Sequence, residues 1–275
     1  RQHLETEADL TIGAIETPVS DASRFGVFEV DNSSRVLSFE EKPPQPRTIP
    51  GNPSAALVSM GIYIFKAKVL KEVLEADAFL PGSSHDFGKD VIPRMVENQR
   101  AVYVFNFQDE NKKDAKYWRD VGTLDSYWEA NMDLVSVDPH FNLYDRKWPM
   151  RTHVPSLPPA KFVFADPGVR FGAAVDSIVS PGCIVSGSLV DHCVLGPEVR
   201  INSYSEVHES ILFDRVVVGR KSRIRRAIIE KDVVVPEKTV LGYNLQEDAR
   251  YFRVTEGGIV VVESTEKLLA HQQKI

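Results

Sequence analysis

The sequence predicts two regions, a layered α/β domain in the first half and a parallel β-helix from about residue 175 onward. Strand-like and helix-like stretches alternate over residues 10–133, a pattern typical of α/β layers. Aliphatic residues then recur in steps of six, six and five, which fits a stacked coil with three short faces. These steps do not fall on one side of a helix with 3.6 residues per turn.

The first region contains the more varied pattern, and its expected elements follow in chain order. They are a helix end at 1–7, strands at 10–15, 59–65 and 101–107, and helices at 66–79, 90–98 and 124–135. Residues 138–159 hold five prolines and little periodicity, which indicates a linker. We therefore predict a first domain over 1–137, a linker over 138–165 and a second domain over 166–275.

The repeat of the second region places one aliphatic side chain inward on each face of a 17-residue coil. Valine runs at 216–218 and 233–235 favour strands over helix. The positions expected to stack into inner ladders are Ile178, Ile184, Val190, Leu195, Ile201, Val207, Leu212, Val218, Ile224, Ile229, Val235 and Leu241.

Bulk composition excludes several classes of protein. A net charge of −6 argues against broad nucleic-acid binding and against attraction to anionic membranes. Neither a membrane-spanning apolar run nor a signal segment is present in the sequence. The two cysteines, Cys183 and Cys193, match neither a redox pair nor a zinc half-site. We expect buried structural thiols and a reduced cytoplasmic setting.

Three polar loops lie beside buried strands, where α/β sheets usually bind ligands. The first, at 39–43, also fits a solvated strand end. In the second, at 85–90, Asp86 also fits a helix N-cap, and a structural role is favoured for His85. In the third, at 117–123, Asp120 suits a Mg²⁺ ligand or an ion pair with Arg119. Each loop taken alone leaves these alternatives open.

The loops together carry a resemblance. The order EEKP at 40–43, SMGIYIF at 59–65, HDFGKDVIP at 85–93 and YWRDVGTLDSYWEAN at 117–131 closely resembles the bacterial glucose-1-phosphate adenylyltransferases. The segment YDRKWPMRTHVPSLPPAKFV at 144–163 is also similar to theirs. The resemblance implies a partial Rossmann-like nucleotidyltransferase domain followed by a left-handed β-helix, which agrees with the repeat.

The resemblance also implies an activity, the transfer of AMP from ATP to α-D-glucose 1-phosphate for glycogen synthesis. By motif, Lys42 is expected to hold the sugar phosphate as a point charge. Asp120 is expected to ligate Mg²⁺ together with a second Asp upstream. The remaining residues implied for the glucose pocket are Glu41, Ser59, Tyr63, Asp86, Phe87 and Trp118.

One feature of the family has no counterpart in this sequence. Members carry a Gly-rich GGxGTRL-type loop near the N-terminus, where it cradles the ATP phosphates. No such stretch is present, and residues 1–7 read as the end of a helix. We therefore expect that the chain corresponds to the C-terminal two-thirds of such an enzyme and is inactive alone.

Regulation is expected in the second region. Six cations fall within residues 220–231, and most are predicted to face outward from the coil. A solvated face or a subunit contact would also explain them. Through the resemblance, Lys231 and Arg226 are the candidates for binding the phosphate of a metabolite effector, in an enzyme that is expected to be a homotetramer.

Three other functions remain open. Base selection belongs to the absent loop, so a guanylyl- or uridylyltransferase is one alternative. A hexapeptide-repeat acyltransferase is another, with His192 or His208 as the available catalytic histidine. The third is a non-catalytic regulatory subunit that keeps the fold and binds effectors.

Overall fold

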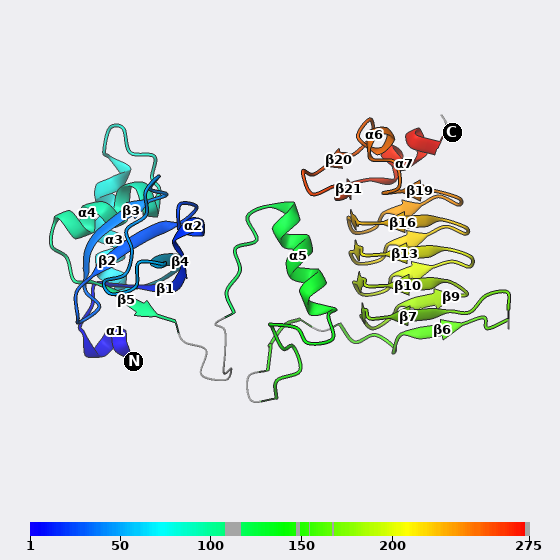
Figure 1. Cartoon of the computed structure of the whole chain (residues 1–275), viewed down its shortest axis with the longest axis horizontal. Helices are drawn as coiled ribbons and strands as arrows, with labels where there is room; N and C mark the ends of the chain where they lie inside the picture. Colours follow the sequence, from blue (N-terminus) through cyan, green and yellow to red (C-terminus); the bar gives the residue numbers. More distant parts are fainter. Residues whose placement is uncertain (108–116, 147–148, 154, 167, 273–275) are drawn as a thin grey trace. The chain divides into compact units, whose positions relative to one another are not determined.

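The computed structural model describes residues 1–107, 117–146, 149–153, 155–166 and 168–272, which form two compact units, Arg1–Trp118 and Arg119–Ile275 (Figure 1). It confirms the predicted fold class, because an α/β region is followed by a parallel β-helix (Figure 1). Lys147, Trp148 and Val154 of the family-like segment lie outside the described residues. In the part of the chain that the structure describes, no helix is long and apolar enough to cross a membrane.

The first unit is built on a mixed five-stranded sheet in the order β3-β2-β4-β1-β5. The central strand β1 pairs antiparallel with β4 and parallel with β5, and β2 pairs antiparallel with β3 and β4. Its strands are β1 Leu10–Pro18, β2 Gly26–Val30, β3 Val36–Glu41, β4 Ala55–Phe65 and β5 Val102–Asn106.

Helices α3 (Ala67–Ala78) and α4 (Ile92–Glu97) pack on this sheet. Val69 of α3 and Met95 of α4 join Leu10 and Ile12 of β1 in one buried core. The other helices of the unit are α1 Gln2–Glu5, α2 Val19–Ala22 and the π-helical turn η1 Phe87–Val91. The predicted strands and helices are confirmed here, whereas α2, β2 and β3 were not among the expected elements, because segments this short show little periodicity.

The second unit stacks short parallel strands into three sheets (Figure 1). The first sheet holds β7 Ala173–Val175, β10 Leu189–Asp191, β13 Glu206–His208, β16 Arg223–Arg225 and β19 Val240–Leu241. The second holds β6 Lys161–Val163, β9 Ile184–Ser186, β12 Arg200–Ile201, β15 Val217–Val218 and β18 Val234–Val235. The third holds β8 Ile178–Val179, β11 Val194–Leu195, β14 Ile211–Leu212, β17 Ala227–Ile229, β21 Val260–Val262 and the antiparallel β20 Arg253–Val254.

The predicted inner ladders are confirmed except in the first coil. Val190, Val207, Ile224 and Leu241 stand in register on one face and are fully buried. In the first coil, the prediction that Ile178 and Ile184 belong to the inner ladders is wrong. The residues in register with the ladders are their neighbours Val179 and Val185. The spacing there is 16 residues, since Val179 aligns with Leu195, and a 17-residue step from the later coils therefore misses by one.

One corner of the coil carries a ladder of buried hydroxyls that the aliphatic period does not reveal. The hydroxyls of Ser188, Ser205 and Ser222 donate to the carbonyls of Asn202, Gly219 and Pro236, at 2.7, 2.8 and 3.0 Å. Ser188 and Ser205 also accept from the next coil, because the backbone N–H of Ser205 donates to Ser188 Oγ and that of Ser222 to Ser205 Oγ, both at 3.1 Å. The ladder satisfies polar backbone groups that the tight corner leaves out of the sheets.

Helix α5 (Leu124–Leu134) belongs to the second unit. Its Tyr127 and Trp128 pack against Ile211 and Ile228 on the outer side of the β-helix, and Trp128 Nε1 donates to the carbonyl of Glu209 at 2.8 Å. We predicted that the first domain ends at residue 137, which would include this helix. The packing instead groups the helix with the β-helix. At the other end, α6 (Leu245–Asp248) and α7 (Thr265–Gln272) follow the last coils.

Candidate functional site

Six of the predicted sugar-pocket residues lie in the first unit, at the end of β3, along β4 and at the start of η1. Lys42 comes directly after β3 in a left-handed conformation, with φ of 50°, and its backbone N–H donates to the carbonyl of Phe25 at 3.0 Å. Its ammonium group lies 4.0 Å from Glu41 Oε1 and is largely exposed. The turn therefore presents a cation beside a carboxylate.

Two glycines make room for the side chain of Glu41. A Cβ atom on Gly26 would lie 2.8 Å from Glu41 Oε2, and one on Gly88 would lie 2.5 Å from the same oxygen. The carboxylate thus rests between β2 and η1. Its pKa is raised, mainly by burial and also by the charge of Asp86, while Lys42 opposes the shift. A desolvated carboxylate of this kind is a strong acceptor for sugar hydroxyls.

A bulge in β4 positions Ser59 and Tyr63. The register opposite β1 jumps from Ile62 to Ser59, so Met60 and Gly61 bulge out of the ladder, and Gly61 takes a φ of 69°. Ser59 and Tyr63 consequently project from the same face of the sheet. Burial raises the pKa of the Tyr63 hydroxyl, a hydrogen bond with Ser59 lowers it, and the carboxylates of Glu41 and Asp86 raise it further.

Asp86 and Phe87 begin η1. Asp86 caps this turn, because its Oδ1 accepts from the backbone N–H of Lys89 at 2.9 Å. Phe87 stacks on Tyr63, with ring centroids 5.4 Å apart. The N-cap expected for Asp86 and its predicted position beside the pocket are therefore compatible, because the cap uses only one of its two carboxylate oxygens.

Trp118 and Asp120 belong to the third polar loop and fall in different units. Trp118 makes an edge contact with Phe25, with ring centroids 5.3 Å apart, so it lies near the turn that holds Lys42. Asp120 belongs to the second unit and is exposed. Mg²⁺ is commonly held by one or two carboxylates together with substrate phosphates, and an exposed single carboxylate suits that role.

Sequence reasoning missed the residues that shape the pocket without lining it. Gly26 gave no signal, because a lone glycine in a strand has many explanations. Lys89 lies inside the HDFGKDVIP motif but was not predicted as a site residue. Its positive charge partly opposes the rise that burial causes in the pKa of Glu41. The buried carboxylate of Asp77 has no motif at all.

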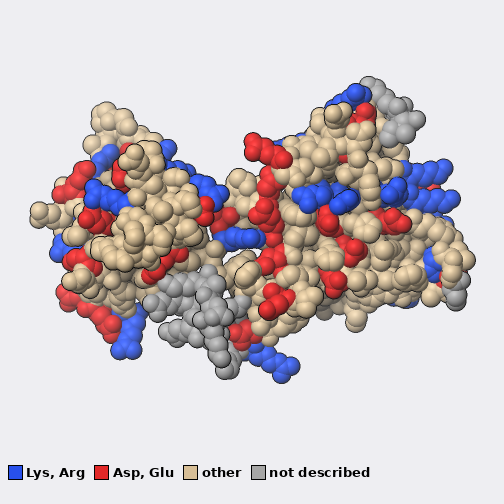
Figure 2. Space-filling model, viewed as in Figure 1, with Lys and Arg blue, Asp and Glu red and all other residues tan. Residues whose placement is uncertain are grey.

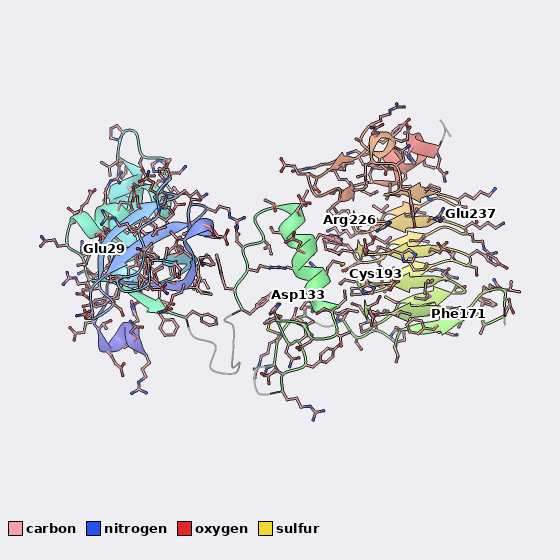
Figure 3. The ribbon with its side chains drawn as sticks, in the orientation of Figure 1. Glu29, Asp133, Phe171, Cys193, Arg226 and Glu237 are labelled. Atoms are coloured by element: carbon pink, nitrogen blue, oxygen red, sulfur yellow. The ribbon has the colours of Figure 1, made fainter. Side chains whose placement is uncertain are left out.

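The basic stretch 220–231 does not form one cluster in space. Arg220 and Lys221 lie at the corner that also holds Lys238, whose backbone N–H donates to the carbonyl of Arg220. Arg226 and Glu237, a neighbour of Lys238, are on opposite sides of the β-helix in Figure 3. Figure 2 shows Lys and Arg side chains at separate places on the β-helix.

The two predicted effector residues differ in their surroundings. The Arg226 guanidinium lies 4.4 Å from the Trp128 ring centroid, donates to the carbonyl of Gly257 at 2.9 Å and approaches Glu209 at 3.8 Å. Lys231 is exposed at another corner of the coil, next to Asp232, which pairs with Arg215. Arg226 therefore has structural partners, whereas Lys231 presents its side chain to solvent.

Comparison with known families divides the chain in two. Residues 1–137 match the family described as nucleotidyl transferase. Residues 158–262 match the GlmU-like, C-terminal hexapeptide family. The first match includes α5, which packs with the β-helix, so the family border and the packing border differ.

Individual relatives agree with both matches. The chain is 56% identical over 263 residues to a glucose-1-phosphate adenylyltransferase of Koribacter versatilis, covering 95% of this chain and 63% of that protein. It is 51% identical over 269 residues to one of Rhodopirellula baltica, covering 97% and 60% respectively. For one of Nitrosomonas europaea the identity is 49% over 264 residues, covering 95% and 61%. The chain, which spans a little over three-fifths of these proteins' length, is a homologue of the glucose-1-phosphate adenylyltransferases.

Proposed function

We propose that this chain supplies the sugar-phosphate pocket and the regulatory β-helix of a glucose-1-phosphate adenylyltransferase. The reaction converts ATP and α-D-glucose 1-phosphate into ADP-glucose and diphosphate. The observation that supports the proposal is that Glu41, Lys42, Tyr63 and Asp86 lie close enough together for their side chains to affect one another's pKa or to form an ion pair. The names of the relatives support the same substrates.

The proposed chemistry is an in-line phosphoryl transfer. An oxygen of the sugar phosphate attacks the α-phosphorus of ATP, the bond to the β-phosphate oxygen breaks, and diphosphate leaves with the electron pair. Lys42 binds the attacking phosphate and offsets its charge, while Glu41 accepts hydrogen bonds from the sugar. Tyr63 and Phe87 form an apolar wall against one side of the sugar ring.

Mg²⁺ is the proposed metal, and Asp120 is the residue of this chain that would ligate it. When bound, the ion would neutralise charge on the phosphates. A cytoplasmic setting is also proposed, and two buried free thiols, Cys183 and Cys193, are consistent with it. A homotetramer and control by phosphorylated metabolites complete the proposal.

Two measurements test it. Isothermal titration should show that this chain binds glucose 1-phosphate more tightly than glucose 6-phosphate, because the cation of Lys42 lies next to Glu41, the carboxylate proposed to bind the sugar hydroxyls. Separately, the full-length gene product should form ADP-glucose from ATP and glucose 1-phosphate, and other nucleoside triphosphates should be poor donors. Binding without turnover in the full-length protein would favour a regulatory subunit, and preference for GTP or UTP would favour another transferase.

A further inference from the structure

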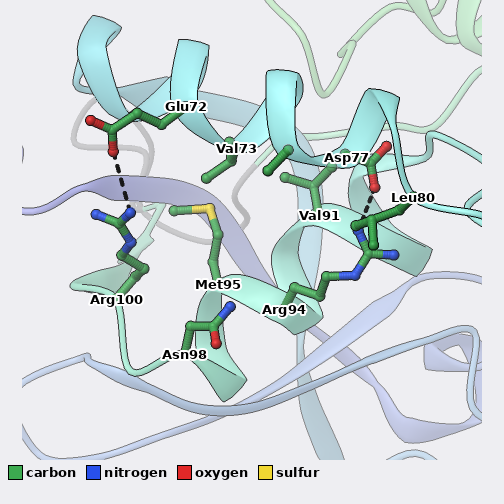
Figure 4. A pocket seen from close by; sticks show the side chains of 10 residues that line it. Glu72, Val73, Asp77, Leu80, Val91, Arg94, Met95, Asn98 and Arg100 are labelled. Carbon is green, nitrogen blue, oxygen red and sulfur yellow. Dashed lines mark hydrogen bonds and ion pairs between the residues drawn. The ribbon is translucent and has the colours of Figure 1, made fainter.

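A buried carboxylate, Asp77, lies at the end of α3. The side chain of Asp77 is 5% exposed and has three side-chain partners. Its oxygens accept from Ser83 Oγ at 2.7 Å and from Arg94 at 2.5 Å, and lie 2.8 Å from His85 Nδ1. Figure 4 shows the pair with Arg94 at one end of a small cavity of about 140 Å³. These partners hold the pKa of Asp77 down to about 2.

Two of the three partners belong to the segment that leads into the pocket. Ser83 and His85 immediately precede Asp86. His85 adopts a φ of 60°, which is costly for a residue with a side chain, and its backbone N–H donates to Ser83 Oγ at 3.1 Å. The buried charge of Asp77 therefore holds a strained backbone conformation directly before a predicted sugar ligand.

A second carboxylate completes the support of this segment. Asp90 Oδ2 accepts from the backbone N–H of Ser84 at 3.2 Å, from Ser84 Oγ at 2.6 Å and from the backbone N–H of Asp86 at 3.2 Å. Arg94 approaches both acids, since it lies 3.8 Å from Asp90 Oδ1. Residues 83–86 are thus fixed at consecutive positions by two acids that share one arginine.

We infer that Asp77 is a positioning residue for the glucose pocket, acting through Ser83 and His85 on Asp86 and Phe87. The inference rests on the proposed sugar-binding function of Asp86. Ordering an exposed loop before the ligand arrives reduces the entropy that binding would otherwise cost. A buried carboxylate suits this task, because removing its charge leaves several donors without an acceptor.

The same cavity provides a matched control. At its other end Glu72 of α3 pairs with Arg100 at 3.3 Å, and both side chains are roughly two-fifths exposed (Figure 4). Glu72→Gln and Asp77→Asn are both changes from acid to amide on one helix, five residues apart. Only the second changes a group that contacts the segment 83–86.

The test is titration of glucose 1-phosphate into the chain and these two variants, with thermal melting to verify the fold. Asp77→Asn should weaken binding about tenfold, because its amide N–H₂ turns a donor toward His85 or Arg94. Glu72→Gln should stay within about twofold of wild type. Equal binding by all three proteins, or equal weakening in both variants, would overturn the inference.

Two further measurements keep the inference separate from the proposed function. Nitrogen-15 spectra above pH 7.5 should show His85 protonated at Nδ1 in the wild type and a tautomer mixture in Asp77→Asn. An unchanged tautomer would refute the contact even if the sugar phosphate does not bind. If Asp77→Asn does not fold, Ser83→Ala on the exposed loop serves as the second variant. It should weaken glucose 1-phosphate binding about threefold. Wild-type affinity in Ser83→Ala would contradict the inference. A wild-type chain that does not bind glucose 1-phosphate would reject the proposed function instead.

Discussion

The two units bury similar aliphatic residues but use polar residues differently. In the β-helix, polar side chains inside the coil form repeating ladders, such as Ser188, Ser205 and Ser222, that satisfy the corners of successive coils. In the α/β unit, buried and half-buried polar groups such as Glu41 and Asp77 occur once each and contact residues distant in the chain. Repetition distributes stability evenly, whereas single arrangements bring different functional groups to one place.

This difference explains why most of the predicted ligand-binding residues lie in the first unit. A repeated coil presents the same corner at every level, so different ligand groups seldom converge there. An irregular sheet, with a bulge at Ser59 and a left-handed turn at Lys42, gathers side chains from three segments. We therefore expect substitutions in the first unit to change ligand binding, and substitutions in the second to change stability or regulation.

The largest effect is expected from an inner-ladder residue. Leu212 is 1% exposed and stands in register with Leu195 and Ile229. Leu212→Ala should destabilise the protein by about 2–5 kcal/mol, because a cavity remains in a close-packed coil. Denaturant unfolding measures this, with Val234→Ala on the outer surface as the control, since Val234 is 47% exposed. Binding of glucose 1-phosphate at low denaturant should be unchanged, and a loss there would contradict the division into two units.

The next effect concerns the pocket. Lys42→Met should weaken glucose 1-phosphate binding about a hundredfold, because it removes the point charge on the phosphate while keeping the length of the side chain. Melting temperature should change little, since the ammonium group is largely exposed. Lys66→Met is the matched control in the same unit, where Lys66 pairs with Asp9 at 3.4 Å. Comparable loss in both variants would point to a general charge effect.

A smaller effect is expected for regulation. In the full-length gene product, Lys231→Glu should raise the activator concentration for half-maximal response about tenfold, because it reverses an exposed charge at the proposed anion site. The KM for glucose 1-phosphate should stay within about twofold. Steady-state kinetics with and without activator separate the two, and a change in KM alone would remove Lys231 from the effector site.

The corner ladder should show a still smaller effect. Ser222→Ala removes a hydroxyl that donates to the carbonyl of Pro236 at 3.0 Å. We expect a loss of about 1 kcal/mol in unfolding free energy, as for other buried hydrogen bonds. Ser33→Ala, at an exposed turn, is the control. A loss no larger than that of the control would show that the ladder adds nothing to stability.

The last prediction concerns acid. The pKa of Asp77 is about 2 in the folded chain and 3.8 ordinarily, so its ionised form stabilises the fold. This contribution is fully present above about pH 4 and is lost as the pH falls toward 2. Asp77→Asn should therefore flatten the pH dependence of stability in that window. Identical acid-unfolding profiles for wild type and variant would contradict the lowered pKa.

The site could be predicted from the sequence only through motifs. EEKP, SMGIYIF and HDFGKDVIP named Glu41, Lys42, Ser59, Tyr63, Asp86 and Phe87, and the structure brings these six together. No local pattern indicates that Gly26 and Gly88 leave space for Glu41, or that Asp77 supports the segment 83–86. Those contacts join residues between 6 and 47 positions apart, on different elements, and the local spacing of side chains does not indicate which of them meet.

The β-helix was determined almost entirely by the sequence, because a coil that stacks on copies of itself must repeat its inward residues at a fixed period. The exception, the shift from Ile178 to Val179 in the first coil, arises where one coil is a residue shorter. Only the tertiary structure decided the fate of the basic stretch 220–231. Three-sided winding sends neighbouring cations to different corners, so Arg226 stacks on Trp128 of α5 while Lys231 faces solvent.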